Sequence, residues 1–279
     1  MLLGNMAFIG PGEIFINYRA LQTTLREIGN AFKAWRGWLS VGWQQFIFQH
    51  RRALIGPFWQ AINAAVWGLG IGVLFKGALH KGDPAFMAYI ASGIVTWNFI
   101  ITCLVSGSNV FNVNANIILN LRIPLLTHAF RLIVFGLAKL LFQCFFLVPV
   151  LIFWGNALSW NMLLVAPGLC MLVLTSAALV PLMGIIGARF RDFPFAVQST
   201  VRFLFFASPV FWKPEMLGRR AFIAHYNPIT HYLAIVREPL LGTPASLYAW
   251  QVVSGTTLVI MLASFFIYHK SRNSIAYWL

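Results

Sequence analysis

The chain has 279 residues, of which 59% are hydrophobic and only 9% are charged, whereas charged residues make up about a quarter of a typical soluble domain. Its 20 lysines and arginines outnumber its 6 aspartates and glutamates, but they flank apolar runs, which favours a role in membrane topology over nucleic-acid binding. The composition therefore excludes an ordinary soluble domain and predicts an all-α integral membrane protein. The three cysteines lie inside apolar runs without metal-ligand spacing, so neither a metal site nor a disulfide framework is predicted.

Two segments precede the first long apolar run. Residues 1–30 show little pattern and are predicted to form a loose or partly helical extension. Residues 31–54 are predicted to form an amphipathic helix that carries Trp35, Trp38 and Trp43 beside basic residues. Such a helix is typical of the membrane interface, and an ordinary amphipathic helix packed on protein is the alternative.

Residues 55–279 are predicted to form one membrane domain. A predominantly apolar segment of about 20 residues is long enough to cross the hydrocarbon core as a helix, because each helical residue adds ~1.5 Å. Six segments meet this description: 57–75, 86–110, 125–153, 162–188, 193–212 and 247–268.

The distribution of lysine and arginine around these spans predicts the orientation of the chain, because cytosolic segments are enriched in basic residues. With the N-terminus inside, the inner segments hold twelve basic residues: Arg19, Arg26, Lys33, Arg36, Arg51, Arg52, Arg122, Arg131, Arg189, Arg191, Lys270 and Arg272. The outer segments hold six: Lys76, Lys81, Lys213, Arg219, Arg220 and Arg237. Both termini are therefore expected in the cytosol.

One apolar segment, residues 221–236, is too short to be a span and contains Asn227 and Pro228 near its middle. Proline lacks the backbone donor and disfavours helix at the residue before it. The segment is therefore predicted to form two short helices in a re-entrant hairpin on the outer side. A surface loop folded over the bundle is the alternative.

The six acidic residues bear on how a membrane domain of this kind is energised. None of them lies in the middle of a predicted span, whereas ion-coupled transporters usually bury carboxylates there. The chain also lacks the G-x-x-x-x-G-K-[ST] pattern that binds ATP phosphates, and it lacks the common hydrolase motifs. If the chain transports a substrate actively, the energy must come from a separate subunit.

Arg131, Lys139 and Arg202 are the only charged residues inside the predicted spans. A buried cation is costly in a membrane, which makes a contact with a phosphate-bearing substrate one interpretation of these residues. Lipid phosphate or a polar partner within the helical bundle is the alternative.

The segment between the fourth and fifth predicted spans is short and charged, with the sequence Arg189, Phe190, Arg191 and Asp192. It connects two spans on the cytosolic side, so it is predicted to be the surface that receives force from an energising subunit. Topological anchoring explains the arginines equally well, but it does not explain Asp192.

Five short motifs, in this order along the chain, resemble the permease subunit of the ABC type-2 polysaccharide exporters, and the resemblance covers about residue 31 to the end. They are RALIGPFW at 52–59, RFRD at 189–192, SPVFW at 208–212, NPIT at 227–230 and IAYWL at 275–279. Members of this family move lipid-linked O-antigen, capsule or teichoic acid polymers.

The resemblance implies a multi-pass permease of the bacterial cytoplasmic (inner) membrane, not an enzyme. It implies a homodimer with a channel between the two copies, paired with two copies of an ATP-binding subunit. ATP and magnesium are then bound by that subunit, and no cofactor by this chain. Export of a small lipid or drug within the same family is one alternative. A membrane enzyme acting on polyprenyl phosphate sugars is another, and it requires acidic residues or a metal near the interface.

Overall fold

The computed structural model describes residues 18–79, 85–121, 123–155, 159–272 and 274–279, and within these ranges the regular elements are all helices. The longer helices are α1 (Tyr18–Lys33), α2 (Trp35–Gln49), α3 (Trp59–Leu79), α4 (Phe86–Ile101), α7 (Leu125–Trp154), α8 (Val165–Arg189), α9 (Phe193–Ala207), α11 (Pro228–Leu240) and α12 (Leu247–Ser271). The short helices are α5 (Val110–Val113), α6 (Ala115–Asn120), α10 (Phe222–Tyr226) and α13 (Ile275–Trp278). A π-helical turn, Thr102–Ser106, extends α4, and 3-10 segments form at Gly56–Phe58, Trp160–Leu164 and Pro214–Ala221.

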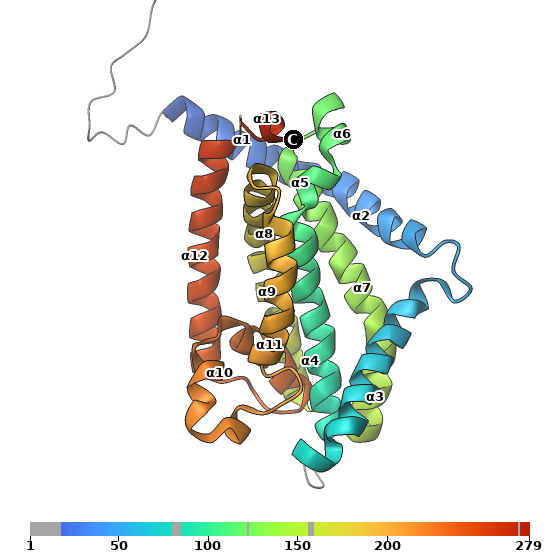
Figure 1. Ribbon diagram of the computed structural model, residues 1–279. Coiled ribbons are helices and arrows are strands. Elements are labelled where there is room, and N and C mark those ends of the chain that lie inside the picture. Colours follow the sequence, from blue (N-terminus) through green and yellow to red (C-terminus); the bar gives the residue numbers. More distant parts are fainter. Residues whose placement is uncertain (1–17, 80–84, 122, 156–158, 273) are drawn as a thin grey trace, which may run out of the picture.

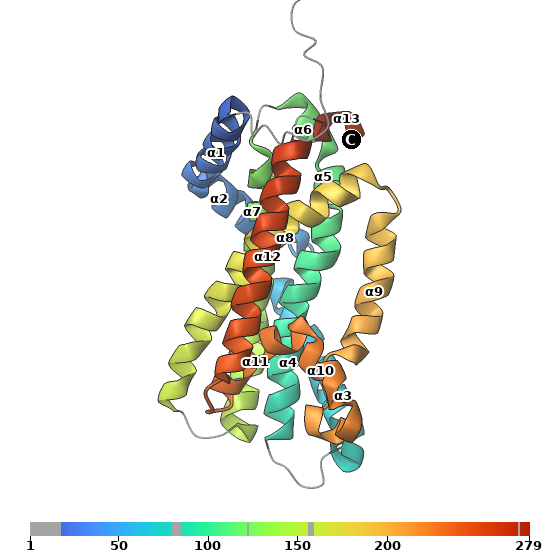
Figure 2. The same ribbon diagram turned by 90° about the vertical axis from the view of Figure 1, so that its left-hand side faces the viewer.

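The long helices α4, α7, α8 and α12 run roughly along one common direction (Figures 1 and 2). Helices α1, α6 and α13 lie at one end of this bundle, and α10 and α11 lie towards the other (Figure 1). We refer to these as the α13 end and the α11 end.

Five helical segments among the described residues are long and apolar enough to cross a membrane. They are Gly56–Phe75, Phe86–Ser106, Leu125–Trp154, Trp160–Arg189 and Leu247–Ser271, and they match five of the six predicted spans. The remaining predicted span, residues 193–212, corresponds to α9, which has only 15 residues and so a length of about 22 Å. The helix ends there because Ser208 adopts an extended conformation directly before Pro209.

Helix α4 lies at the centre of the bundle. Of its most apolar stretch 72% is buried, compared with 22% for the first span and 17% for α12. Helix α8 passes close to the chain that follows α4, because Gly187 has no side chain: a Cβ atom there would lie 1.7 Å from the carbonyl oxygen of Ser108. Asn112 Nδ2 donates a hydrogen bond to Gly187 O at 3.1 Å and fixes this crossing.

The N-terminal region differs from the prediction in its bounds. Residues 18–33, mostly assigned to the extension, form α1, and the helix predicted over 31–54 is α2, which ends at Gln49. Its tryptophans separate into two groups, because one face of α2 packs on α7. Trp35 and Trp43 are exposed, whereas Trp38 is half-buried and donates a hydrogen bond from Nε1 to Ala31 O at 3.0 Å.

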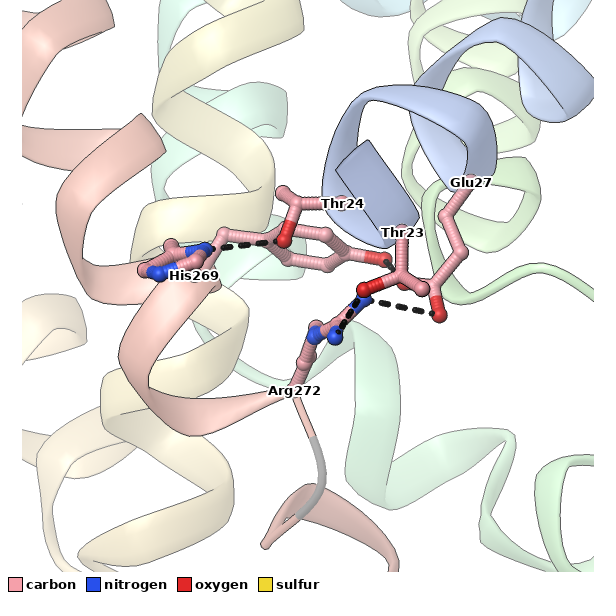
Figure 3. Close-up of polar contacts among 6 residues, drawn as sticks. Thr23, Thr24, Glu27, His269 and Arg272 are labelled. Atoms are coloured by element: carbon pink, nitrogen blue, oxygen red, sulfur yellow. Dashed lines mark hydrogen bonds and ion pairs between the residues drawn. The ribbon is translucent and has the colours of Figure 1, made fainter. Parts of the chain in front are cut away.

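Polar side chains hold α1 against the C-terminal end of α12 (Figure 3). Arg272 lies 3.2 Å from the Glu27 carboxylate and also donates a hydrogen bond of 2.5 Å to Thr23. Thr24 bonds the ring of His269 at 2.9 Å. Residues separated by more than 240 positions are thus joined at the α13 end.

The prediction of two helices separated at Asn227 agrees with the structure. Helix α10 ends at Tyr226, Asn227 is extended, and α11 begins at Pro228. The Asn227 side chain accepts a hydrogen bond from Ile229 N at 3.0 Å and so caps α11. Helix α11 is buried from Thr230 to Arg237, between α4, α8 and α12.

Candidate functional site

The candidate site surrounds the π-helical turn Thr102–Ser106 that extends α4. Turns of this kind are rare and frequently mark functional positions. Two cavities border the turn and share Val105 and Ser106 in their walls. We call them the Arg131 pocket and the Arg202 pocket, and their volumes are about 330 and 300 Å³.

The Arg131 pocket is lined by polar side chains from several helices. Arg131 on α7 donates a hydrogen bond from Nη2 to Asn114 Oδ1, and Asn114 Nδ2 donates to Val110 O at 2.6 Å. The Asn114 amide is therefore held from both sides and positions the guanidinium group at the wall of the pocket.

His128 lies one turn before Arg131 on the same face of α7 and also lines this pocket. Its side chain is only 3% exposed, and neither ring nitrogen has a hydrogen-bond partner within the described ranges. Gln45 and Asn109 add amide groups to the wall. A buried histidine without a protein partner leaves hydrogen-bonding capacity for a bound molecule.

The charge of the Arg131 pocket favours an anion. Its described lining residues include Arg131 but no aspartate or glutamate. A guanidinium group with neighbouring amide and imidazole donors is the set of groups that binds phosphate oxygens in proteins.

The Arg202 pocket lies on the other side of the same turn. Arg202 on α9 is exposed and lines the pocket together with Gln198, Thr102 and Ser106. Lys139 on α7 donates a hydrogen bond of 3.2 Å to Thr102 Oγ1. The three cations that the sequence singled out therefore lie against one structural feature: Arg131 and Arg202 line the two pockets, and Lys139 bonds to the turn between them.

The predicted coupling loop connects α8 to α9. Helix α8 ends at Arg189, and Phe190 is extended, so the loop is short; its residues Arg189, Phe190, Arg191 and Asp192 are all exposed. The Arg189 guanidinium lies 5.2 Å from the ring of Trp278 in α13, which places the loop at the α13 end. The Asp192 side chain does not cap α9, so its carboxylate is not used by the helix that follows.

Asn227 and Pro228 lie at the start of α11 and contact other elements. Asn227 Nδ2 donates hydrogen bonds to Ser208 Oγ at 2.9 Å and to Ala207 O at 3.3 Å, which ties α11 to the end of α9. Pro228 lines an apolar cavity that is separate from the two pockets at the π-helical turn.

The sequence did not identify His128, Gln45, Asn109 or Asn114. A signal existed for His128, because it stands three residues before Arg131 and so shares its helical face. For the others there was none, because Gln45 comes from α2, and Asn109 and Asn114 flank the short helix α5, whose position depends on tertiary packing.

Comparisons with known proteins agree with this architecture. Residues 36–241 match the family described as ABC-2 type transporter. The chain is similar to the O-antigen export system permease protein RfbA of Myxococcus xanthus, with 23% identity over 236 residues, which cover 82% of this chain and 89% of that protein. The region that matches the family includes α2 from its second residue, both pockets, the loop before α9 and all of α11.

Proposed function

This chain belongs to the ABC-2 type transporter family, and we propose that it is the membrane-spanning subunit of an ATP-driven exporter of lipid-linked polysaccharide. The observation that carries the substrate assignment is the pair of pockets on either side of the π-helical turn, each with one arginine in its wall. A polysaccharide linked to a lipid through phosphate presents the anionic group that such pockets bind. The name of the Myxococcus xanthus relative supports the same substrate class.

The proposed arrangement places the chain in the bacterial cytoplasmic membrane with six spans. The five long helices supply five of them, and α9 together with residues 208–212 supplies the sixth. The α13 end faces the cytosol, because the exposed arginines of the coupling loop and both ends of the described chain lie there. Helices α10 and α11 then form a re-entrant hairpin on the outer side.

The proposed partners are a second copy of this chain and two copies of an ATP-binding subunit that holds ATP and magnesium. The ATP-binding subunit docks on the coupling loop, and Asp192 offers it a carboxylate that no helix cap uses. Because the loop joins α8 directly to α9, a movement there displaces the wall of the Arg202 pocket.

Coupling is tested by replacing Asp192 with alanine in the reconstituted complex of permease and ATP-binding subunit. We expect the variant to insert normally but to lose most of the ATP turnover that substrate elicits from the wild-type complex. The matched control is Glu215→Ala, which removes an exposed carboxylate from the segment Pro214–Ala221, outside the loop. Wild-type turnover by Asp192→Ala at equal protein levels removes the loop from the mechanism.

The substrate class is tested with Arg131→Gln, for which Arg36→Gln on the exposed face of α2 is the matched control. We expect only Arg131→Gln to abolish stimulation of ATP turnover by lipid-linked polysaccharide. A strain that lacks the chain should lose surface polysaccharide. Unchanged surface polysaccharide with increased sensitivity to a drug or small lipid contradicts this substrate and supports the alternative within the same family.

A further inference from the structure

A third cavity, of about 390 Å³, lies between α9 and α12. Helices α4 and α8 form its floor with Ile100 and Leu172, and α11 closes one side with Pro228 and Ile229. Figure 2 shows α9 at the edge of the bundle, apart from α12, with α4 between them. We call this cavity the α9–α12 pocket, and it shares no lining residue with the Arg131 pocket or the Arg202 pocket.

The hydroxyl groups in its wall bond to one another. Tyr232 OH lies 3.0 Å from Thr175 Oγ1 and 3.1 Å from Thr256 Oγ1 in the wall, and 2.9 Å from the buried Thr257 Oγ1 behind it. Each of these threonines also donates to a backbone carbonyl in its own helix. Ser176 Oγ likewise donates to Leu172 O at 2.8 Å. Because a hydroxyl has a single donor, these hydroxyl groups have no hydrogen left to donate to a sugar or a phosphate.

The pocket lies at the depth of the hydrocarbon core. Thr175 is near the middle of the span Trp160–Arg189, and Val259 is at the middle of Leu247–Ser271. Val259 is 66% exposed, so the pocket opens on the outer surface of the bundle. Molecules that reach this opening from the membrane are hydrocarbon chains.

The volume is within the range of pockets that hold small ligands. A largely apolar cavity of this size gains little from water, because its few hydroxyl groups already bond to one another and to backbone carbonyls. An empty cavity, in turn, forfeits dispersion contacts. We propose that the α9–α12 pocket binds one hydrocarbon chain of a lipid. This inference does not depend on the substrate proposed above.

The test uses the full chain in lipid nanodiscs with two photoreactive probes. One is a phospholipid with a diazirine in its acyl chain, and the other is a polyprenyl phosphate with a diazirine in its isoprenoid chain. We expect the label on residues that line the pocket, which are Thr175, Ser176 and Leu179 of α8 and Thr256, Val259 and Ile260 of α12. Stronger pocket labelling by the phospholipid identifies a membrane lipid as the source, and stronger labelling by the polyprenyl phosphate identifies a lipid carrier.

The matched variants are Val259→Trp and Leu258→Trp. Both residues are exposed on α12, but only Val259 lines the pocket. The larger ring of Val259→Trp is expected to displace about two methylene groups of the bound hydrocarbon chain. The lost burial of these groups weakens pocket labelling about fifteenfold, whereas Leu258→Trp leaves it unchanged. Equal labelling of residues that do not line the pocket, or an equal loss of labelling in both variants, overturns the proposal.

If Val259→Trp fails to assemble, the position of the label in the wild-type chain decides the question alone. Loss of Asp192 coupling does not alter this labelling, so the two proposals fail independently.

Discussion

Arg272 and Arg237 each join segments that are distant in the sequence, at different ends of the bundle and in different surroundings. At the α13 end, Arg272, whose side chain is 11% exposed, pairs with the carboxylate of Glu27, whose side chain is 44% exposed. On α11, Arg237 is 4% exposed, and its guanidinium lies 3.8 Å from the centre of the Tyr89 ring. Water reaches the Glu27 carboxylate and weakens its attraction to Arg272, whereas it cannot reach the contacts of Arg237.

The contacts of Arg237 hold the segment that follows α9. Arg237 Nη1 donates a hydrogen bond to Pro209 O at 2.6 Å, and Tyr89 OH donates to Trp212 O at 2.9 Å. The α11 end is therefore fixed by desolvated contacts to backbone carbonyls. At the α13 end the Glu27 carboxylate remains partly in water, which suits an end proposed to receive another subunit.

The largest effect is expected from Arg237→Met. The substitution leaves Pro209 O without its charged donor and removes the cation above Tyr89, for a loss of about 2–3 kcal/mol of unfolding free energy. Thermal unfolding in detergent, followed by fluorescence, measures this loss. The control is Lys213→Met, which removes a more distant cation, 5.6 Å from the same ring, for a loss of about 0.5–1 kcal/mol. Equal losses in the two variants would mean that burial adds nothing to the contacts of Arg237, on which the contrast with the α13 end depends.

The next effect is expected from Gly93→Ala on α4. A Cβ atom at this position would lie 2.6 Å from Val210 O, so the segment after α9 has to move, at a cost of about 1–3 kcal/mol. The control is Gly255→Ala on α12, where the new Cβ has no atom within 4 Å and the helix gains up to about 1 kcal/mol. The stability changes of both variants are measured by the same thermal unfolding assay. A stable Gly93→Ala protein would show that this segment is not tightly held.

Much of the bundle could be predicted because its signals are local. Long uncharged runs give the five long spans, and Pro228 after Asn227 gives the break between α10 and α11. The length of α9 could not be predicted, because residues 193–212 carry no charge except Arg202, and Pro209 ends the helix earlier.

The candidate site was only partly predictable. Charges inside apolar runs identified Arg131, Lys139 and Arg202, but nothing local indicates a π-helical turn or that these three residues meet around it. Arg237 was counted as an outer basic residue, because the sequence does not show that α11 is buried between other helices. Burial of a short amphipathic helix depends on the packing of the whole bundle.

A smaller effect is expected from Asn227→Ala. The substitution removes the cap of α11 and the bonds to Ser208 and Ala207, and loss of a helix cap costs about 1 kcal/mol. Faster hydrogen–deuterium exchange is expected in the first turn of α11 and the last turn of α9. Asn227→Ser restores an acceptor for Ile229 N but is too short to reach Ser208 in the same way, so it should rescue the exchange in α11 and not in α9. Rescue of both turns contradicts a separate role for the contact with Ser208.

The smallest effect is expected from Glu27→Gln at the α13 end. The substitution removes the charge that faces Arg272, and an ion pair this exposed contributes only about 0.2–1 kcal/mol. Tyr268 OH also donates a hydrogen bond to the Glu27 carboxylate at 3.2 Å, and the neutral amide oxygen of glutamine can still accept it.

The stability lost in Glu27→Gln should therefore be electrostatic and should shrink as salt is raised, since ~1 M salt reduces the screening length to about 3 Å. Hydrogen–deuterium exchange of the α1 amides at low and high salt measures it, with Glu215→Gln as the matched carboxylate outside this contact. A salt-independent loss as large as that of Arg237→Met would mean that the α13 end is held by desolvated contacts as well, and the contrast between the two ends would disappear.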